Sequence, residues 1–237
     1  MDSDTEADLT DIRRAQKLSF SMSQVMDEGQ RTIQIITRGE YANLVQEAED
    51  EHRLLRKYLV ATDLSDESTH ALEWAIGTVL RDGDTLIAIY CVDEDTSIAP
   101  ADGSSVPDEP KAMKEQATAI NVIANSKTPV SPGGSAMPLH PRPSPLSQVS
   151  DAGSGTLSLS PAPSSKERGK LEEERWRAAH DISERVTKLL RKTRLQVRVI
   201  VEVVHCKNPK HLITEVIDLV NPTLVILGSR GRSALKG

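Results

Sequence analysis

Four short apolar runs, separated by stretches with helical periodicity, restrict the fold of this sequence more than any other feature. The runs are Lys57–Thr62, Thr85–Val92, Gln196–Val204 and Thr223–Leu227. Each has the length of a strand buried on both faces, and the stretches after Ser65, Leu171 and Pro209 repeat apolar residues at three- and four-residue spacing. Strands that alternate with helices form a parallel sheet with helices on both faces. The sequence therefore predicts an open, doubly wound α/β fold.

A long proline-rich stretch separates the second run from the third. Eleven of the 13 prolines lie from Pro100 to Pro163, and this stretch contains no Phe, Tyr or Trp. A segment so poor in large apolar groups cannot offset the entropy cost of ordering its backbone. We expect a disordered insert over residues 95–168, with at most a transient helix at Lys111–Ala124. We also expect residues 1–38 to be a largely disordered tail.

The remaining chain makes one small domain in two parts, residues 57–94 and 169–237. An amphipathic pattern over residues 39–56 predicts a helix ahead of the first strand. We expect this helix to dock on the domain, and binding of a partner is the alternative.

Charge and composition argue against several function classes. A net charge of −6 does not suit a general electrostatic grip on nucleic acid or on an anionic membrane. No apolar run approaches the roughly 18 residues of a membrane span, and the acidic start lacks the apolar core of a secretory signal. Cys91 and Cys206 lie in apolar runs, so we expect buried thiols and no disulfide. We expect a soluble, cytoplasmic protein.

Candidate binding residues lie at the ends of the predicted strands, because open parallel sheets bind ligands where the strand order reverses. Asp63 follows the first strand and can accept hydrogen bonds from a ribose hydroxyl or an adenine amine, although an Asp here also commonly caps a helix. Gly228 and Gly231 follow the fourth strand and let backbone amides approach an anion, although such a pair is often only a turn.

The sequence contains no catalytic constellation. It has no glycine-rich Walker sequence, no nucleophile elbow, and no histidines or cysteines at metal-ligand spacing. We expect a binding module with no catalytic residues, no metal ion and at most weak ATPase activity.

Three stretches resemble the universal stress protein family: Lys57–Ser65, Ala88–Asp93 and Leu224–Ser233. The first is similar to the family's first strand, with its Asp before a Ser-capped helix. The last is similar to the opening of its Gly-x-x-Gly-x9-Gly-Ser/Thr phosphate motif. The resemblance covers about 57–94 and 170–237. It implies a sheet like that of adenine nucleotide α-hydrolases, with strand order 3-2-1-4.

The resemblance also implies a site for ATP or AMP. Its base and ribose residues are Ala61, Thr62, Asp63 and Cys91. Its phosphate-side residues are Gly228, Arg230 and Gly231. The chain ends at Gly237, before the family's next motif glycine and before its fifth strand, which often forms the dimer contact in relatives. We therefore expect a truncated chain with weak nucleotide affinity, and a homodimer in a full-length form.

Three functions remain open at this point. The prediction is a nucleotide-binding regulatory module in the stress response. The alternative is an interaction protein without nucleotide, whose insert docks protein partners and is phosphorylated at Ser144 or Ser160, each beside a proline. The third is an enzyme of the adenine nucleotide α-hydrolase or electron-transfer-flavoprotein type, which the absence of a glycine-rich loop after the first strand disfavours.

Overall fold

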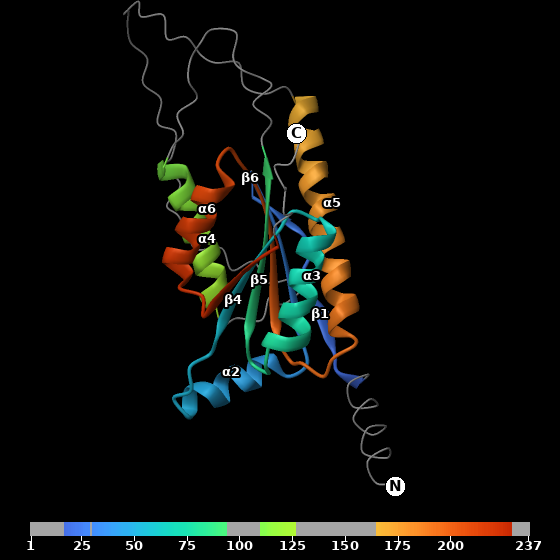
Figure 1. The fold of residues 1–237 in the computed structure, drawn as a ribbon, viewed down its shortest axis with the longest axis vertical. Coiled ribbons are helices and arrows are strands. Elements are labelled where there is room, and N and C mark those ends of the chain that lie inside the picture. Colours follow the sequence, from blue (N-terminus) through green and yellow to red (C-terminus); the bar gives the residue numbers. More distant parts are fainter. Residues whose placement is uncertain (1–16, 29, 94–109, 127–164, 229–237) are drawn as a thin grey trace, which may run out of the picture.

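The computed structural model describes residues 17–28, 30–93, 110–126 and 165–228. Its strands are β1 (Phe20–Met22), β2 (Met26–Asp27), β3 (Arg31–Arg38), β4 (Lys57–Thr62), β5 (Thr85–Asp93), β6 (Arg198–Cys206) and β7 (Leu224–Leu227). Its helices are α2 (Tyr41–Asp50), α3 (Asp66–Trp74), the π-helical turn η1 (Ala75–Val79), α4 (Pro110–Asn125), α5 (Ser165–Leu190) and α6 (Pro209–Val220). In the described residues the strands form one sheet with helices on both faces (Figure 1).

The four strands predicted from the sequence form the parallel part of this sheet. The order β6-β5-β4-β7 is the predicted order 3-2-1-4, and each neighbouring pair is parallel. The doubly wound parallel sheet is therefore confirmed. From β4 the chain passes to β5 on one side, and it reaches β7 on the other side only after β6. The strand order therefore reverses at β4.

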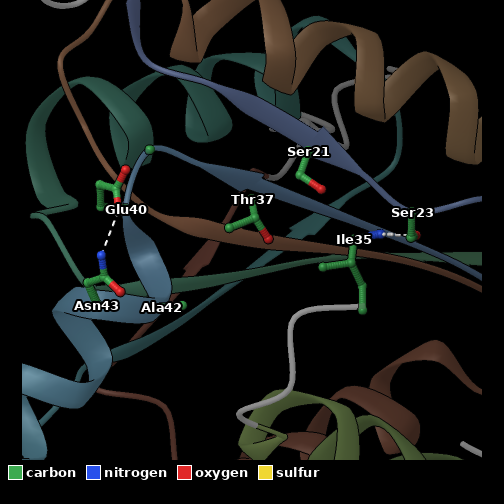
Figure 2. A pocket seen from close by; sticks show the side chains of 8 residues that line it. Ser21, Ser23, Ile35, Thr37, Glu40, Ala42 and Asn43 are labelled. Carbon is green, nitrogen blue, oxygen red and sulfur yellow. Dashed lines mark hydrogen bonds between the residues drawn. The ribbon is translucent and has the colours of Figure 1, made fainter. Parts of the chain in front are cut away.

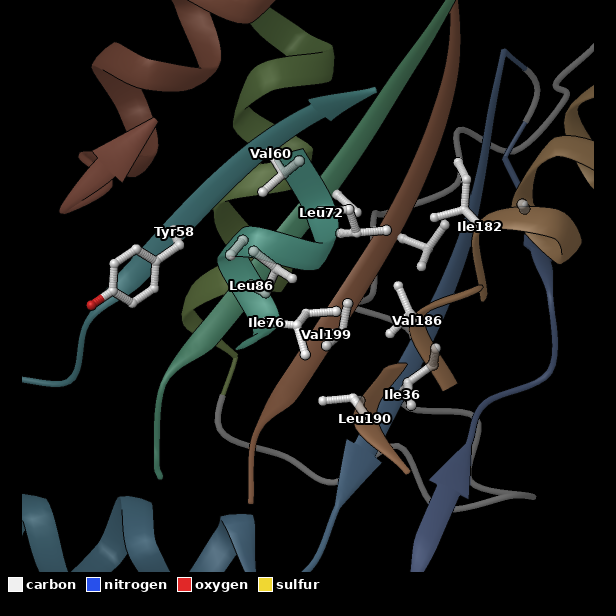
Figure 3. Close-up of a cluster of buried hydrophobic side chains, with 14 of the residues drawn as sticks. Ile36, Tyr58, Val60, Leu72, Ile76, Leu86, Ile182, Val186, Leu190 and Val199 are labelled. Carbon is white, nitrogen blue, oxygen red and sulfur yellow. The ribbon is translucent and has the colours of Figure 1, made fainter. Parts of the chain in front are cut away.

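Two apolar cores lie on opposite faces of the sheet. On one face α3, η1 and α5 pack against the strands, and Figure 3 shows Leu72, Ile76, Ile182 and Val186 in the same apolar cluster as Val199 of β6. On the other face α4 and α6 cover β4, β5 and β6. The sheet is thus buried on both faces, as its continuous apolar strands require.

The ends of the helices follow the expected local chemistry. Ser65 is the N-cap of α3 and its side chain accepts a hydrogen bond from the Ser68 N–H. Pro209 stands at the start of α6, and Asn208 caps that helix by accepting from the His211 N–H at 3.1 Å. These positions satisfy N–H groups that a helix start leaves unpaired.

The expectation of a largely disordered tail over residues 1–38 is wrong for its second half. β3 pairs antiparallel with β6 along its length, from Arg31 opposite Val204 to Thr37 opposite Arg198, and β1 and β2 pair with β3. The strand contains five β-branched residues, which favour a pleated, buried surface: Thr32, Ile33, Ile35, Ile36 and Thr37. Residues 1–16 lie outside the described part of the chain.

The two arginines of β3 are buried, and each meets a partner distant in sequence. The Arg31 Nε lies 2.8 Å from Glu202 Oε1 on β6. Arg38 donates to the Leu190 carbonyl and lies over the Phe20 ring, 5.1 Å from its centroid. These contacts hold the N-terminal strands against the edge of the parallel sheet.

The insert expected over residues 95–168 is ordered in part. α4 lies within it and packs against α6 through four buried residues at helical spacing: Met113, Ala117, Ile120 and Ala124. The transient helix of the sequence analysis is therefore a core element, because its apolar stripe covers one face of the sheet. α5 begins at Ser165, and residues 94–109 and 127–164 lie outside the described part.

Both tryptophans lie at the surface, although each stands in an amphipathic helix. Trp74 is 50% exposed and Trp176 is 52% exposed. α5 instead turns small residues toward the sheet, and Ala178 and Ala179 are buried there. The N-terminal helix α2 docks through Val45 and Ala48.

Candidate functional site

The predicted site residues of the first and fourth strands lie together at the point where the strand order reverses. β4 and β7 are parallel neighbours, with Ala61 opposite Leu227. Thr62 and Gly228 follow these paired residues, so both strands end at the same edge. We call the surface formed by residues 61–65, Ser68 and Gly228 the strand-end site.

The turn from β4 to α3 holds Asp63 in a fixed arrangement. Its Oδ1 accepts from the Ser65 N–H at 3.0 Å and from the Ser65 hydroxyl. Leu64 adopts a left-handed conformation with φ of 62°, which tightens the turn. Asp63 therefore stabilises the start of α3, as a capping Asp does, and its side chain is also exposed to solvent. A carboxylate placed this way can accept further hydrogen bonds.

Hydroxyl groups link the turn to the first turn of α3. Thr62 Oγ1 lies 3.0 Å from Ser68 Oγ and accepts from the Leu64 N–H at 3.1 Å. Ser65 Oγ accepts from the Ser68 N–H at 3.3 Å. Ser68 is fully buried, and the sequence analysis missed it. Its spacing of three residues from the N-cap Ser65 was the available signal.

Gly228 lies against the backbone of α3. A Cβ at this position would lie 2.3 Å from the Ser68 Cα and 2.8 Å from the Glu67 carbonyl oxygen. No side chain can occupy that space, because the groups it would meet are backbone atoms. The glycine is thus required for close packing of β7 on α3, whereas the sequence predicted a backbone approach to an anion.

Tyr90 is a further residue near the strand-end site that the sequence analysis did not single out. It lies directly opposite Thr62 on the neighbouring strand β5 and is half-buried. Burial raises the pKa of Tyr90, and the negative charges of Glu174 and Asp63 raise it further. The phenol therefore stays protonated at neutral pH and can donate a hydrogen bond.

Cys91 lies on the same face of the sheet as Ala61, in the apolar cluster beneath α4 and α6. A hydrogen bond with the Cys206 thiol, together with burial, raises the pKa of Cys91 strongly. Cys91 is half-buried and Cys206 is buried, and no disulfide bond joins them. A protonated, buried thiol is a packing group and a poor nucleophile.

Two open pockets among the described residues lie away from the strand-end site. One has a volume of about 210 Å³ and lies between β1, β3 and the start of α2, with Ser21, Thr37 and Asn43 on its walls (Figure 2). The other lies along α5. The strand-end site is a surface at the ends of β4 and β7, and Arg230 and Gly231, predicted to face the phosphates, lie outside the described residues.

Comparison with known proteins identifies the chain's family. The model described as "Universal stress protein family" matches residues 55–135 and 131–237. The chain belongs to the universal stress protein family. This universal stress protein is also 30% identical, over 99% of its length, to an uncharacterized protein of Schizosaccharomyces pombe. The chain spans 28% of the length of that relative. No solved structure matches this chain.

Two classes of feature are absent from the described part of this universal stress protein. None of its described helices has both the length and the apolarity needed to cross a bilayer. The same residues contain no group of three or more His, Cys, Asp or Glu side chains that could hold a metal ion.

Proposed function

We propose that this universal stress protein is a regulatory module of the stress response that binds an adenine nucleotide, ATP or AMP, at the strand-end site. Proteins of the family often bind ATP or other nucleotides. The observation that carries the proposal is the parallel pairing of β4 with β7, which brings Asp63 and Gly228 to one edge of the sheet. Open parallel sheets bind ligands at such reversal points.

The residues present suit the adenosine half of a nucleotide. Asp63 has an exposed carboxylate whose Oδ1 is held by Ser65, so a ribose hydroxyl can donate to it without reorganising the turn. Ala61 and Thr62 are half-buried beside it and offer a partly apolar surface for the base. Cys91 belongs to the wall behind Ala61 and supplies packing only.

The phosphate half depends on a balance of charges. The N-terminus of α3 favours an anion, but Asp66 and Glu67 in its first turn add negative charge there. Arg230, predicted from the sequence to pair with phosphate, would offset these carboxylates. We accordingly expect AMP and ATP to bind with similar affinities, because the contacts to adenosine supply most of the binding energy.

Calorimetric titration of AMP and ATP into the chain and into Asp63→Asn tests the proposal. Asn keeps an oxygen for the Ser65 N–H but loses the charge, so the turn should persist while nucleotide affinity falls about tenfold, or about 1.4 kcal/mol. Asp66→Asn, three residues further along the chain, is the matched control. It removes a negative charge from the first turn of α3, so nucleotide affinity should stay equal or rise. Equal affinity of the chain and Asp63→Asn would contradict this placement of the ribose.

An interaction protein without nucleotide is the second candidate function. It is favoured by the close contact of Gly228 with the backbone of Ser68 at the strand-end site. Absence of any heat of binding for AMP and for ATP would support this alternative.

A further inference from the structure

A groove lies along α5 beside the edge strand β1, at the opposite edge of the sheet from β7 (Figure 1). We call it the α5–β1 groove. It has a volume of about 570 Å³. Its lining consists of Met22 from β1 and of His180, Ser183, Glu184, Thr187, Lys188 and Arg191 from α5.

Two hydroxyl groups in the lining have no partner among the described residues. Ser183 is 1% exposed, and neither its Oγ nor the Oγ1 of Thr187 forms a hydrogen bond there. A buried polar group left unpaired costs about 1–3 kcal/mol, so such groups are uncommon and call for a reason. One reason is that a ligand in the groove uses them.

The charge of the lining favours an anion. Lys188 and Arg191 are exposed, and Glu184 is the single carboxylate among the lining residues. The Arg191 guanidinium lies 5.7 Å from the Phe20 ring centroid, which holds it beside β1. Basic residues are common at the end of a helix because they offset its dipole. The unpaired hydroxyls of Ser183 and Thr187 are not a usual feature of a helix end, so they distinguish this groove from one.

We propose that the α5–β1 groove binds the phosphate monoester of a small organic molecule. A phosphate monoester carries three strong acceptor oxygens and a charge of about −1.5 to −2. The groove provides hydrogen-bond donors from Arg191, Lys188 and the two hydroxyls. These are more donors than the two oxygens of a carboxylate can use, so they suit a phosphate better. Met22 and the imidazole of His180, which stacks on Trp176, offer a less polar surface for the organic part.

The stack of Trp176 on His180 provides a signal for binding. Their ring centroids are 5.5 Å apart and the rings are parallel within 1°. The chain contains two tryptophans, so Trp74→Phe leaves Trp176, beside the groove, as the single tryptophan, whose emission can be excited selectively. We use this variant as the background and phenyl phosphate as the probe, followed by fluorescence and by calorimetry.

We expect saturable, one-to-one binding of phenyl phosphate and no binding of phenol. Arg191→Gln should weaken binding at least tenfold, because it removes a charge that faces the phosphate. Ser183→Ala should also weaken binding several-fold while leaving stability unchanged or raised, since it deletes an unpaired buried hydroxyl. If Ser183 had only a structural role, its replacement would not weaken phenyl phosphate binding while leaving stability unchanged or raised.

Two controls separate this site from other sources of binding. Arg177→Gln removes an arginine from the same helix that pairs with Glu173 at 2.9 Å and does not line the groove, so phenyl phosphate affinity should stay the same. Asp63→Asn should also have no effect, which makes the result independent of the nucleotide proposal. Absence of saturable binding, or equal losses in Arg177→Gln and Arg191→Gln, would overturn the proposal.

Discussion

Replacing Glu202 with leucine should lower the free energy of unfolding by about 3–5 kcal/mol, the usual cost of removing one partner from a buried ion pair. Glu202 is fully buried, and Arg31, which is 4% exposed, would be left with a charge that it cannot lose. Equilibrium unfolding in guanidinium chloride at a pH above the pKa of Glu202, about 8, where its carboxyl is ionised, measures the change. The expected loss would weaken the contact between β3 and β6 in particular.

Two further variants give this measurement its controls. Glu28 lies 3.7 Å from the same Arg31 but is exposed, so Glu28→Gln should cost about 0–1 kcal/mol. The double variant Arg31→Met with Glu202→Leu replaces both charges by apolar groups and should recover most of the stability that Glu202→Leu loses. Additive losses in the double variant would show that the two side chains do not act as a pair.

The same carboxyl should make stability depend on pH. Burial raises the pKa of Glu202 from 4.5 to about 8, against the opposing charge of Arg31. The folded chain therefore keeps a proton that the unfolded chain releases above about pH 4.5, so this contribution falls as the pH rises from about 4.5 to about 8. Relative to Glu202→Gln, the unmodified chain should lose stability across that interval, and parallel pH profiles would contradict this.

Gly228→Ala should destabilise the fold by about 1–3 kcal/mol, as overpacking of a closely packed site does. The new methyl would meet the Ser68 Cα at 2.3 Å, and neither backbone can move without separating β7 from α3. Because these segments form the strand-end site, we also expect nucleotide affinity to fall. Thermal unfolding and AMP titration of the same preparation test both effects.

Gly77→Ala is the matched control for this substitution. Gly77 lies in η1, directly after α3, and a Cβ there would have no atom within 4 Å. Removing the freedom of an exposed helical glycine should leave stability unchanged or raise it by about 0.4–1 kcal/mol. If both substitutions cost the same, the contact between Gly228 and Ser68 does not matter to the fold.

The parallel sheet, and the common edge at which β4 and β7 end, were predictable because the sequence patterns that indicate them are local. Each of the four strands is a continuous apolar run, and the helix starts at Ser65 and Pro209 have their usual capping residues. Parallel strands end at a common edge, so the approach of Asp63 to Gly228 follows from the topology. The family resemblance added the order of the strands.

The N-terminal strands and α4 were not predictable on the same grounds. β3 contains Arg31 and Arg38, and two arginines in a short segment indicate an exposed segment. Their partners, Glu202 and Leu190, lie more than 150 residues later in the chain, so the sequence around β3 does not reveal them. The helical spacing of apolar residues in α4 could be read from the sequence. The proline-rich composition around it favoured disorder, so only a transient helix was predicted there. The close contact of Gly228 with Ser68 was not predicted, since it depends on two elements far apart in the chain.

Backbone amide shifts recorded by NMR during an AMP titration test most directly whether nucleotide binds where β4 and β7 end. We predict that the largest shifts belong to residues 61–65, Ser68 and Gly228, and that they saturate together. Shifts confined to other surfaces, such as the α5–β1 groove, or no shifts at all, would contradict the proposed function.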